Sequence, residues 1–291
     1  MIIIDYNGIA IANIMVQRLA IDENIIRHMI LNSIRMYRAR FNKDYGEVVI
    51  CSDAGGNWRK KVFPQYKAAR KKTRDKSSMD WNEVFRITSM VREEIRENFP
   101  YKVMHVEGCE ADDCIAQLVE ETQEFGKAED VMIVSSDKDF AQLQRYSNVK
   151  QYSPMQKKFI VEKNPRTLLE EHILQGDTSD GVPNVLSPDN TFTDGLRQTP
   201  LRKKLRDLLV EDPHSQGDEI YRNYLRNKKM IDLRECPDTI KTDIINKFDD
   251  QEPISNKAKV FPFLVNKQCR LLLENVQEFI CLLYTSDAAD E

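Results

Sequence analysis

Three short apolar segments of this chain each end in aspartate, a residue type that can bind metal ions. The segments cover residues 2–5, 48–53 and 131–139, and the last of them carries both Asp137 and Asp139. Short runs rich in valine and isoleucine are typical of strands that are buried on both faces of a parallel sheet. Ligands of such sheets bind beyond the carboxyl ends of the strands. We therefore expect four carboxylates to converge at one edge of a sheet.

Carboxylates that converge in this way repel one another unless a cation lies between them. An all-oxygen donor set suits a hard divalent ion such as Mg²⁺, which keeps several of its water ligands and bridges readily to phosphate. The six cysteines form no C-x-x-C pair, and the four histidines are scattered along the chain. Because zinc prefers cysteine and histidine ligands, the sequence indicates a magnesium site rather than a zinc site.

Three further acids, Glu110, Asp112 and Asp113, stand at the predicted start of a helix. Asp112 precedes the apolar residues Ile115 and Val119 by three and seven positions, which places it near the buried side of that helix. A carboxylate in such a place needs a partner. Acids are also frequent in the first turn of ordinary helices, because they suit the helix dipole. The proximity of acid-tipped strands favours a role in the metal site.

Basic residues gather in one segment of the chain. Between residues 59 and 76 there are nine lysines and arginines against a single acid, although the whole chain has 43 basic and 47 acidic residues. A second basic group lies within residues 197–206. Basic stripes beside an acidic cluster indicate a polyanion held close to metal ions, whereas a solvated charged loop is the alternative for such a run alone. Tyr66 offers a face for base stacking, and Lys67 and Arg70 share one side of a helix.

Apolar spacing and capping residues predict the remaining elements. We expect a strand over residues 103–106 and a helix that begins near Pro64 or Gln65. The other predicted helices cover residues 23–41, 81–98, 110–119, 165–174, 201–209, 218–225, 239–248 and 267–279. The alternation of strands and helices predicts an α/β fold in which helices flank a mostly parallel central sheet. No apolar run reaches the roughly 20 residues of a membrane-spanning helix, so we expect no membrane partner.

Taken in chain order, the motifs resemble the flap endonuclease and 5′-3′ exonuclease family, and within it most closely the ribonucleases H of T-even bacteriophages. The matching segments are residues 3–5, 50–53, 66–70, 110–113, 134–140, 152–155 and 176–180. Each motif alone is weak, but their occurrence in the family's order over residues 2–180 is specific. The resemblance implies a PIN-like nuclease core, with a helical arch over residues 58–80 and a helical C-terminal part.

The same resemblance implies two Mg²⁺ ions, for which Mn²⁺ could substitute. Ligands of the first ion would be Asp5, Asp53, Glu110 and Asp112, with Asp113 in a supporting place. Asp137 would lie between the two ions, and the second would be surrounded by Asp139, Asp177 and Asp180. Two such ions can activate a water and stabilise the leaving oxygen, so that no protein nucleophile is required.

The resemblance also implies how nucleic acid would bind. A single-stranded 5′ end would pass through the arch, where Lys67 and Arg70 would hold the scissile phosphate. These two residues would act in catalysis together with Asp112 and Asp137. The expected nucleic-acid contacts are Arg59, Lys60, Tyr66, Lys67, Arg70, Lys71, Lys72, Arg197, Arg202 and Lys203.

The expected organisation is a metal-dependent 5′-nuclease domain over residues 1–165, a helical DNA-binding region over 166–279, and a tail over 280–291 that is disordered and not native. The implied activity is 5′-3′ hydrolysis of RNA primers in RNA–DNA hybrids and of 5′ flaps or duplex DNA during phage DNA replication. We expect a monomer in the host cytoplasm, with single-stranded DNA-binding protein and sliding clamp as further partners.

The sequence departs from the family after Gly176 and Asp177. Gly181 occupies a position at which most members have asparagine, and residues 186–192 lack the Gly-x-Gly hairpin that grips duplex phosphates. We therefore do not expect the potassium-assisted duplex grip of cellular relatives. Two alternatives remain: a related PIN-like RNA endonuclease, which gives no reason for the arch, and a catalytically inactive nucleic-acid clamp, which substituted acids would favour.

Overall fold

A six-stranded sheet forms the centre of the computed structural model, which describes residues 1–16 and 21–280. The strands are β1 (Ile2–Asp5), β2 (Val48–Cys51), β3 (Lys102–Met104), β4 (Val131–Val134), β5 (Val149–Ser153) and β6 (Lys158–Ile160). Their order is β3-β2-β1-β4-β5-β6, and every neighbouring pair is parallel except β5 with β6. The prediction of a mostly parallel sheet in an α/β fold is confirmed.

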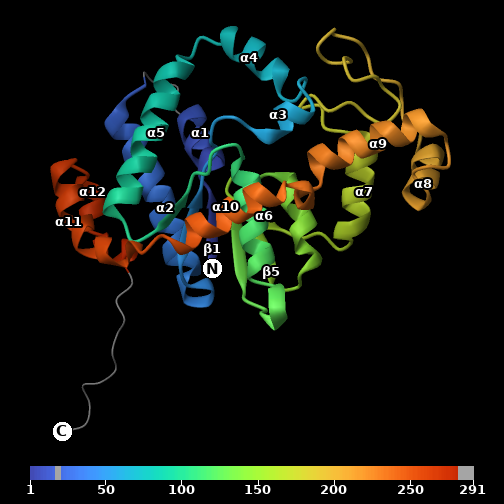
Figure 1. The fold of residues 1–291 in the computed structure, drawn as a ribbon. Helices are drawn as coiled ribbons and strands as arrows, with labels where there is room; N and C mark the ends of the chain where they lie inside the picture. Colours follow the sequence, from blue (N-terminus) through green and yellow to red (C-terminus); the bar gives the residue numbers. More distant parts are fainter. Residues whose placement is uncertain (17–20, 281–291) are drawn as a thin grey trace.

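Helices cover both faces of this sheet (Figure 1). Ile2 and Ile4 pack into one core, and Ile3, between them, packs into the other. The first core is completed by α1 (Tyr6–Val16), α2 (Glu23–Tyr45), α5 (Trp81–Asn98), α11 (Lys257–Asn266) and α12 (Arg270–Leu273). The second is completed by α6 (Ala111–Glu121), α7 (Pro165–Gln175), α8 (Lys203–Glu211), α9 (Asp218–Ile231) and α10 (Asp238–Asp249). Because both faces are buried, the central strands β1, β2 and β4 are apolar apart from Asp5.

Short 3₁₀ helices connect several of these elements. They are η1 (Glu124–Gly126), η2 (Lys138–Arg145), η3 (Leu233–Glu235), η4 (Pro253–Asn256) and η5 (Val276–Phe279). Among the helices of residues 1–16 and 21–280, none is long and apolar enough to cross a membrane.

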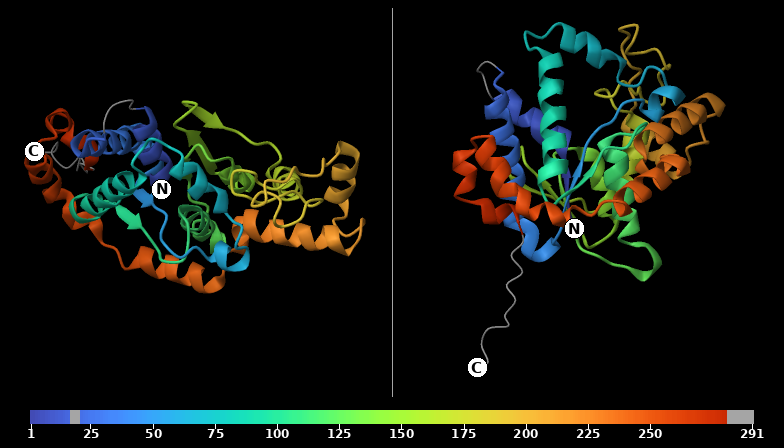
Figure 2. Two further views of the ribbon diagram at one scale, coloured as in Figure 1. Left: turned by 90° about the horizontal axis from the view of Figure 1, so that it is seen from above. Right: turned by 60° about the vertical axis from the view of Figure 1, so that its left-hand side comes forward.

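The basic segment after β2 stands above the carboxyl edge of the sheet as an arch (Figures 1 and 2). It rises through α3 (Trp58–Val62) and α4 (Ala68–Asp75) and returns through α5, whose first turn is capped by the Asp80 carboxylate. The expected helix start near Pro64 or Gln65 is wrong. The helix begins three residues later, because Lys67 has a φ of +56° and its N–H donates to the Asp180 carbonyl at 2.7 Å instead of continuing a turn.

The C-terminal helices also differ from the prediction. The expected helix over 267–279 is replaced by the short α12 and η5, and the preceding segment forms α11 although it contains Pro262. Proline is disfavoured inside helices because it lacks an N–H donor. Burial of Val260, Phe263 and Leu264 in the core stabilises α11 despite the proline.

Candidate metal centre

A cavity of about 670 Å³ opens at the carboxyl edge of the sheet, under the arch. Seven carboxylates line it: Asp5, Asp53, Asp112, Asp137, Asp139, Asp177 and Asp180. They come from the end of β1, the loop after β2, the first turn of α6, the segment after β4 and the loop after α7. The structure thus brings together seven of the nine acids expected at the metals.

Backbone and hydroxyl donors fix Asp5 at the end of β1. Its Oδ1 accepts from the Gly8 N–H at 2.9 Å, and its Oδ2 accepts from the Ser135 hydroxyl at 2.8 Å. A side chain at position 8 would be excluded, since a Cβ there would lie 2.5 Å from Asp5 Oδ2. The Ser135 hydroxyl also accepts from the Asp137 N–H at 3.1 Å, so it joins β1 to the acids after β4.

Asp53 is held in a similar way by residues of neighbouring elements. Its Oδ1 accepts from the Ala111 N–H at 2.9 Å, at the start of α6. The Asn7 amide nitrogen donates to its Oδ2 at 3.2 Å, and the Asn7 oxygen accepts from the Asp53 N–H. Sequence reasoning missed the positioning by Asn7 and Ser135, because neither contact leaves a pattern in the chain.

A tight turn after α7 presents Asp177. Gly176 has a φ of +69°, and a Cβ there would lie 2.4 Å from the Val182 carbonyl oxygen, so only glycine fits. The Oδ1 atom of Asp177 accepts from the Ser179 N–H at 2.8 Å and from its hydroxyl at 2.6 Å. Gly181 allows the base of the arch to approach, since a Cβ there would lie 3.1 Å from the Gln65 carbonyl oxygen.

The charges in the cavity disturb one another. Burial, with nearby Asp53 and Asp137, raises the pKa of Asp5 to about 6 despite its hydrogen bonds. Burial and Asp137 raise the pKa of Asp139 to about 7 and that of Asp112 well above its usual range. A hard cation would stabilise the ionised form of these buried, mutually repelling carboxylates. The oxygen donors around the cavity fit Mg²⁺.

The three acids at the start of α6 diverge in space. Asp112 faces the cavity, whereas Glu110 lines a neighbouring hollow of about 430 Å³ that also contains Asp53 and Lys67. Asp113 is fully buried and accepts two hydrogen bonds from the Arg59 guanidinium, at 2.8 and 2.9 Å. It also accepts from the Glu110 N–H and closes a capping box. Asp113 therefore faces Arg59 and supports the start of α6, and its supporting place beside the metal ions stays a prediction.

The structure corrects the expectation for Arg59. It was expected to contact nucleic acid, yet it is 1% exposed. Its Nε donates to the Met230 carbonyl at 3.1 Å, and its Nη1 lies 3.4 Å from Glu110 Oε2. Arg59 therefore ties the base of the arch to α6 and to the end of α9, out of reach of a ligand.

Tyr66 likewise cannot offer a stacking face, because it is only 3% exposed. Its hydroxyl contacts the carboxylates of Glu110 and Asp180, at 2.8 and 2.9 Å. Lys67 forms an ion pair with Glu110 and lies 3.5 Å from Asp180, and Arg70 pairs with Asp180. The arch residues expected to bind phosphate therefore contact the acids in this structure.

Four of the remaining expected nucleic-acid contacts lie on the surface. Lys60, Arg197, Arg202 and Lys203 are exposed, and Lys60 lines the neighbouring hollow beside Glu110. The side chains of Lys71 and Lys72 lie outside the described part of the structure, as does nearly all of the expected tail, from residue 281.

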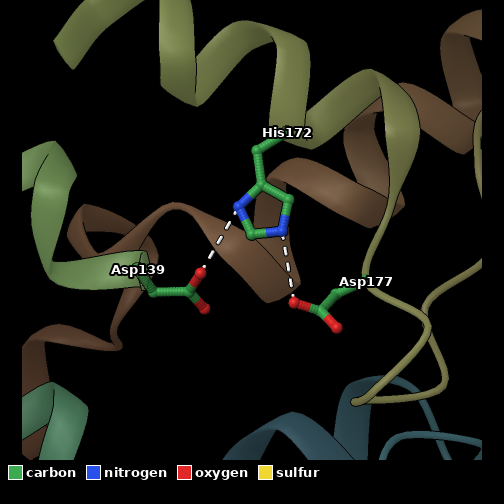
Figure 3. Close-up of side chains that lie close together, drawn as sticks. All are labelled: Asp139, His172 and Asp177. Carbon is green, nitrogen blue, oxygen red and sulfur yellow. Dashed lines mark hydrogen bonds and ion pairs between the residues drawn. The ribbon is translucent and has the colours of Figure 1, made fainter. Parts of the chain in front are cut away.

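Sequence reasoning did not single out two residues that contact the cavity acids, His172 and Lys138. His172 in α7 lies between Asp139 and Asp177, with ring nitrogens 3.4 and 3.2 Å from their carboxylates (Figure 3). Lys138 Nζ lies 2.9 Å from Asp177 Oδ2. Burial raises the pKa of Asp177, but hydrogen bonds from His172, Ser179 and Lys138 outweigh it and hold that pKa below its usual range.

Comparison with known proteins assigns relatives to both parts of the chain. Residues 5–172 match a family model described as the 5′-3′ exonuclease N-terminal resolvase-like domain, and residues 167–279 match the T4 RNase H C-terminal model. The chain is 31% identical over 292 residues to ribonuclease H of Enterobacteria phage T4, with 95% of each chain covered. It is 30% identical over 154 residues to a 5′-3′ exonuclease of Buchnera aphidicola subsp. Schizaphis graminum, which covers 50% of each chain.

Solved structures share the fold. A flap endonuclease of bacteriophage T5 in a complex with DNA and metal ions has a TM-score of 0.57 at 15% identity, and covers 92% of this chain and 98% of that chain. A T5 5′-exonuclease with bound zinc has a TM-score of 0.56 at 14% identity, and covers 96% and 98%. At such identities the likeness is one of fold alone. The expected resemblance to ribonucleases H of T-even phages is confirmed by the phage T4 relative.

Proposed function

Since this chain belongs to the 5′-3′ exonuclease family, we propose that it hydrolyses phosphodiester bonds of RNA primers and 5′ flaps with two Mg²⁺ ions, during DNA replication. The observation that carries the proposal is the convergence of seven carboxylates from five separate segments on one cavity under a basic arch. Carboxylates that lie this close repel one another and destabilise the fold, so their convergence indicates a cation site. The T4 relative is named a ribonuclease H and a T5 neighbour a flap endonuclease, which supports the substrate class.

The carboxylates divide into two groups around Asp137. We assign Asp5, Asp53, Asp112 and Glu110 to the first ion and Asp139, Asp177 and Asp180 to the second. Bound Mg²⁺ would supply an activated water and charge stabilisation for the leaving oxygen. Mn²⁺ carries the same charge and accepts oxygen ligands, so we propose that it substitutes.

Lys67 and Arg70 are proposed to hold the scissile phosphate. Both lie on the cavity wall and pair with Glu110 and Asp180 in this structure. With those acids balanced by metal charge, the two cations can turn to the phosphate and its developing negative charge. Tyr66 keeps Glu110 and Asp180 in place through its hydroxyl, and so acts as a positioning residue.

The two parts of the chain would divide the work. We propose that residues 1–165 carry the chemistry and that residues 166–279 bind duplex DNA through exposed basic residues such as Arg197, Arg202 and Lys203. Phosphate contacts of this kind position a duplex without reading its sequence. We further propose that the protein is intracellular and monomeric, and that it contacts a single-stranded DNA-binding protein and a sliding clamp.

The direct test uses a 5′-flap duplex and an RNA–DNA hybrid, each labelled at the 5′ end or at the 3′ end. We expect cleavage in Mg²⁺ and none in EDTA, with short products released from the 5′ end. Uncleaved substrate that is nevertheless bound tightly would support the inactive clamp instead. Release of products from the 3′ end would contradict the family assignment of polarity.

A further inference from the structure

His172 lies in the last turn of α7, between two of the proposed metal ligands, Asp139 and Asp177 (Figure 3). Its Nδ1 is 3.4 Å from Asp139 Oδ1, and its Nε2 is 3.2 Å from Asp177 Oδ2. One ligand atom from each of these three residues lies within 4.8 Å of the other two. Octahedral ligands bonded at about 2.1 Å are about 3 Å apart in neighbouring positions and about 4.2 Å apart in opposite ones. Because the 4.8 Å limit exceeds the larger of these separations, a small shift of the side chains would let the cluster share one ion.

A buried carboxylate oxygen in this cluster lacks a hydrogen-bond donor. Within residues 1–16 and 21–280, no group donates a hydrogen bond to Asp139 Oδ1, although that atom is inaccessible to solvent. Buried polar atoms are normally satisfied, so the exception needs an explanation. Asp177, by contrast, has polar partners on both carboxylate oxygens: Ser179 donates to Oδ1, and Lys138 and His172 contact Oδ2. Lys138 is 64% exposed and can leave without disturbing the fold.

We propose that His172 binds the second metal ion through one ring nitrogen, beside Asp139 and Asp177, and shifts that position toward Mn²⁺ and other transition metals relative to Mg²⁺. The inference rests on the proposed two-metal function. Imidazole is a ligand of borderline ions such as Co²⁺ and Zn²⁺, and Mn²⁺, although it favours oxygen, accepts imidazole more readily than Mg²⁺ does. An ion at this place would also give Asp139 Oδ1 the partner that it lacks.

The second ring nitrogen has a role in this arrangement as well. A histidine bound to a metal commonly donates its other N–H to a carboxylate, which fixes the orientation of the ring. Asp139 and Asp177 lie on opposite sides of the His172 ring, so whichever nitrogen binds the ion, the other has a carboxylate within reach. The competing explanation is that His172 serves only as a cation that balances the two acids.

Electron spin-echo spectroscopy of the Mn²⁺-loaded protein separates these explanations without reference to catalysis. A nitrogen bonded directly to Mn²⁺ modulates the echo. We expect this modulation in the wild type, a change of its frequencies on labelling the histidines with ¹⁵N, and its loss in His172→Gln. The matched control is His28→Gln, which alters a histidine on α2, away from the cavity, and should keep the modulation.

Calorimetric titrations give the second readout. His172→Gln should weaken Mn²⁺ binding at one of two positions by at least about tenfold, and Mg²⁺ binding by much less. Two bound Mn²⁺ ions without nitrogen modulation in the wild type would overturn the His172 assignment but leave the two-metal function standing. If no Mn²⁺ binds at all, the metal centre and this inference both fail. The isotope experiment needs no variant, so a folding defect of His172→Gln cannot obscure the result.

Discussion

Asp112 and Asp113 are adjacent in sequence and lie in the same helical turn, but their surroundings are opposite. Asp113 is buried against the Arg59 guanidinium, which supplies a full positive charge and two hydrogen bonds. Asp112 faces a cavity whose other walls carry more carboxylates, and its pKa is raised well above its usual range by burial and Asp137. One acid has a cation built into the fold, and we propose that the other takes a cation from solution.

The comparison teaches how one acidic motif can serve two purposes. The Arg59–Asp113 pair fixes the base of the arch to the start of α6, and with it the backbone that presents Glu110 and Asp112. The cavity carries seven carboxylates but few cations: Lys67 and Arg70 pair with Glu110 and Asp180, and Lys138 pairs with Asp177. Within this motif the two adjacent acids are therefore distinguished by the Arg59 guanidinium, which donates hydrogen bonds to Asp113.

The largest expected effect is on catalysis by the acid proposed to lie between the two ions. Asp137→Asn should lower the single-turnover rate by at least about a thousandfold, since charge stabilisation in the site is then lost. Substrate affinity should stay within a few-fold or increase, because less negative charge opposes DNA. The control is Asp243→Asn, an exposed acid on α10. Near-normal turnover of Asp137→Asn at saturating Mg²⁺ would contradict the assignment of two metal ions to this site.

Breaking the built-in pair should act on stability instead. Asp113→Asn leaves Arg59 buried and poorly paired, and should lower the free energy of unfolding by about 3–5 kcal/mol. Urea unfolding measures this change. The double variant Arg59→Met, Asp113→Leu should recover much of the loss, because apolar side chains need no partner. A loss below about 1 kcal/mol in Asp113→Asn would mean that the pair does not fix the arch.

Lys67 and Arg70 test whether the rim cations take part in the reaction. Lys67→Ala and Arg70→Ala should lower the single-turnover rate on a flap substrate by about 10- to 100-fold, and weaken binding much less, since contacts made only in the transition state behave in this way. Lys60→Ala is the control. It should weaken binding and reduce the salt slope by about one unit. An effect of Lys67→Ala on affinity alone would make the arch a passive tether.

The smallest effect expected here is on thermal stability as a function of pH. Asp5 and Asp139 have pKa values of about 6 and about 7 in the folded protein, both raised mainly by burial, against 3.8 unfolded. Between about pH 4 and 7 the folded state binds more protons, so without metal its stability falls as the pH rises. Mg²⁺ binds the deprotonated acids and should raise the melting temperature more at pH 7.5 than at pH 5.5. An equal rise at both values would contradict these shifts.

Much of the sheet and of the cavity could be predicted from local patterns. The central strands β1, β2 and β4 are apolar because both faces are buried, and an aspartate at or soon after the last residue marks the carboxyl end of each. The helix capped by Asp80 was predictable because its signal lies within a few residues. These features depend on neighbours in sequence, and their positions follow from the periodicity of the chain.

Contacts between distant segments account for what was missed. Nothing near Arg59 indicates that Asp113, 54 residues away, would bury it. Tyr66 is drawn inside by Glu110 and Asp180, which come from two other segments. The place of His172 depends on the turn at Gly176, which brings Asp177 back toward α7. Residue type alone therefore overestimates how many charged and aromatic side chains are available to a ligand.

The most direct test of the central claim is the unfolding of Asp112→Asn, measured by urea in EDTA and in Mg²⁺ beside the wild type. Removing a charge that lacks a partner should raise the free energy of unfolding in EDTA and reduce the stabilisation that Mg²⁺ gives. Asp113→Asn should shift the EDTA value in the opposite direction. If Asp112→Asn instead destabilises the protein in EDTA and leaves the effect of Mg²⁺ unchanged, the cavity carboxylates do not await a metal ion.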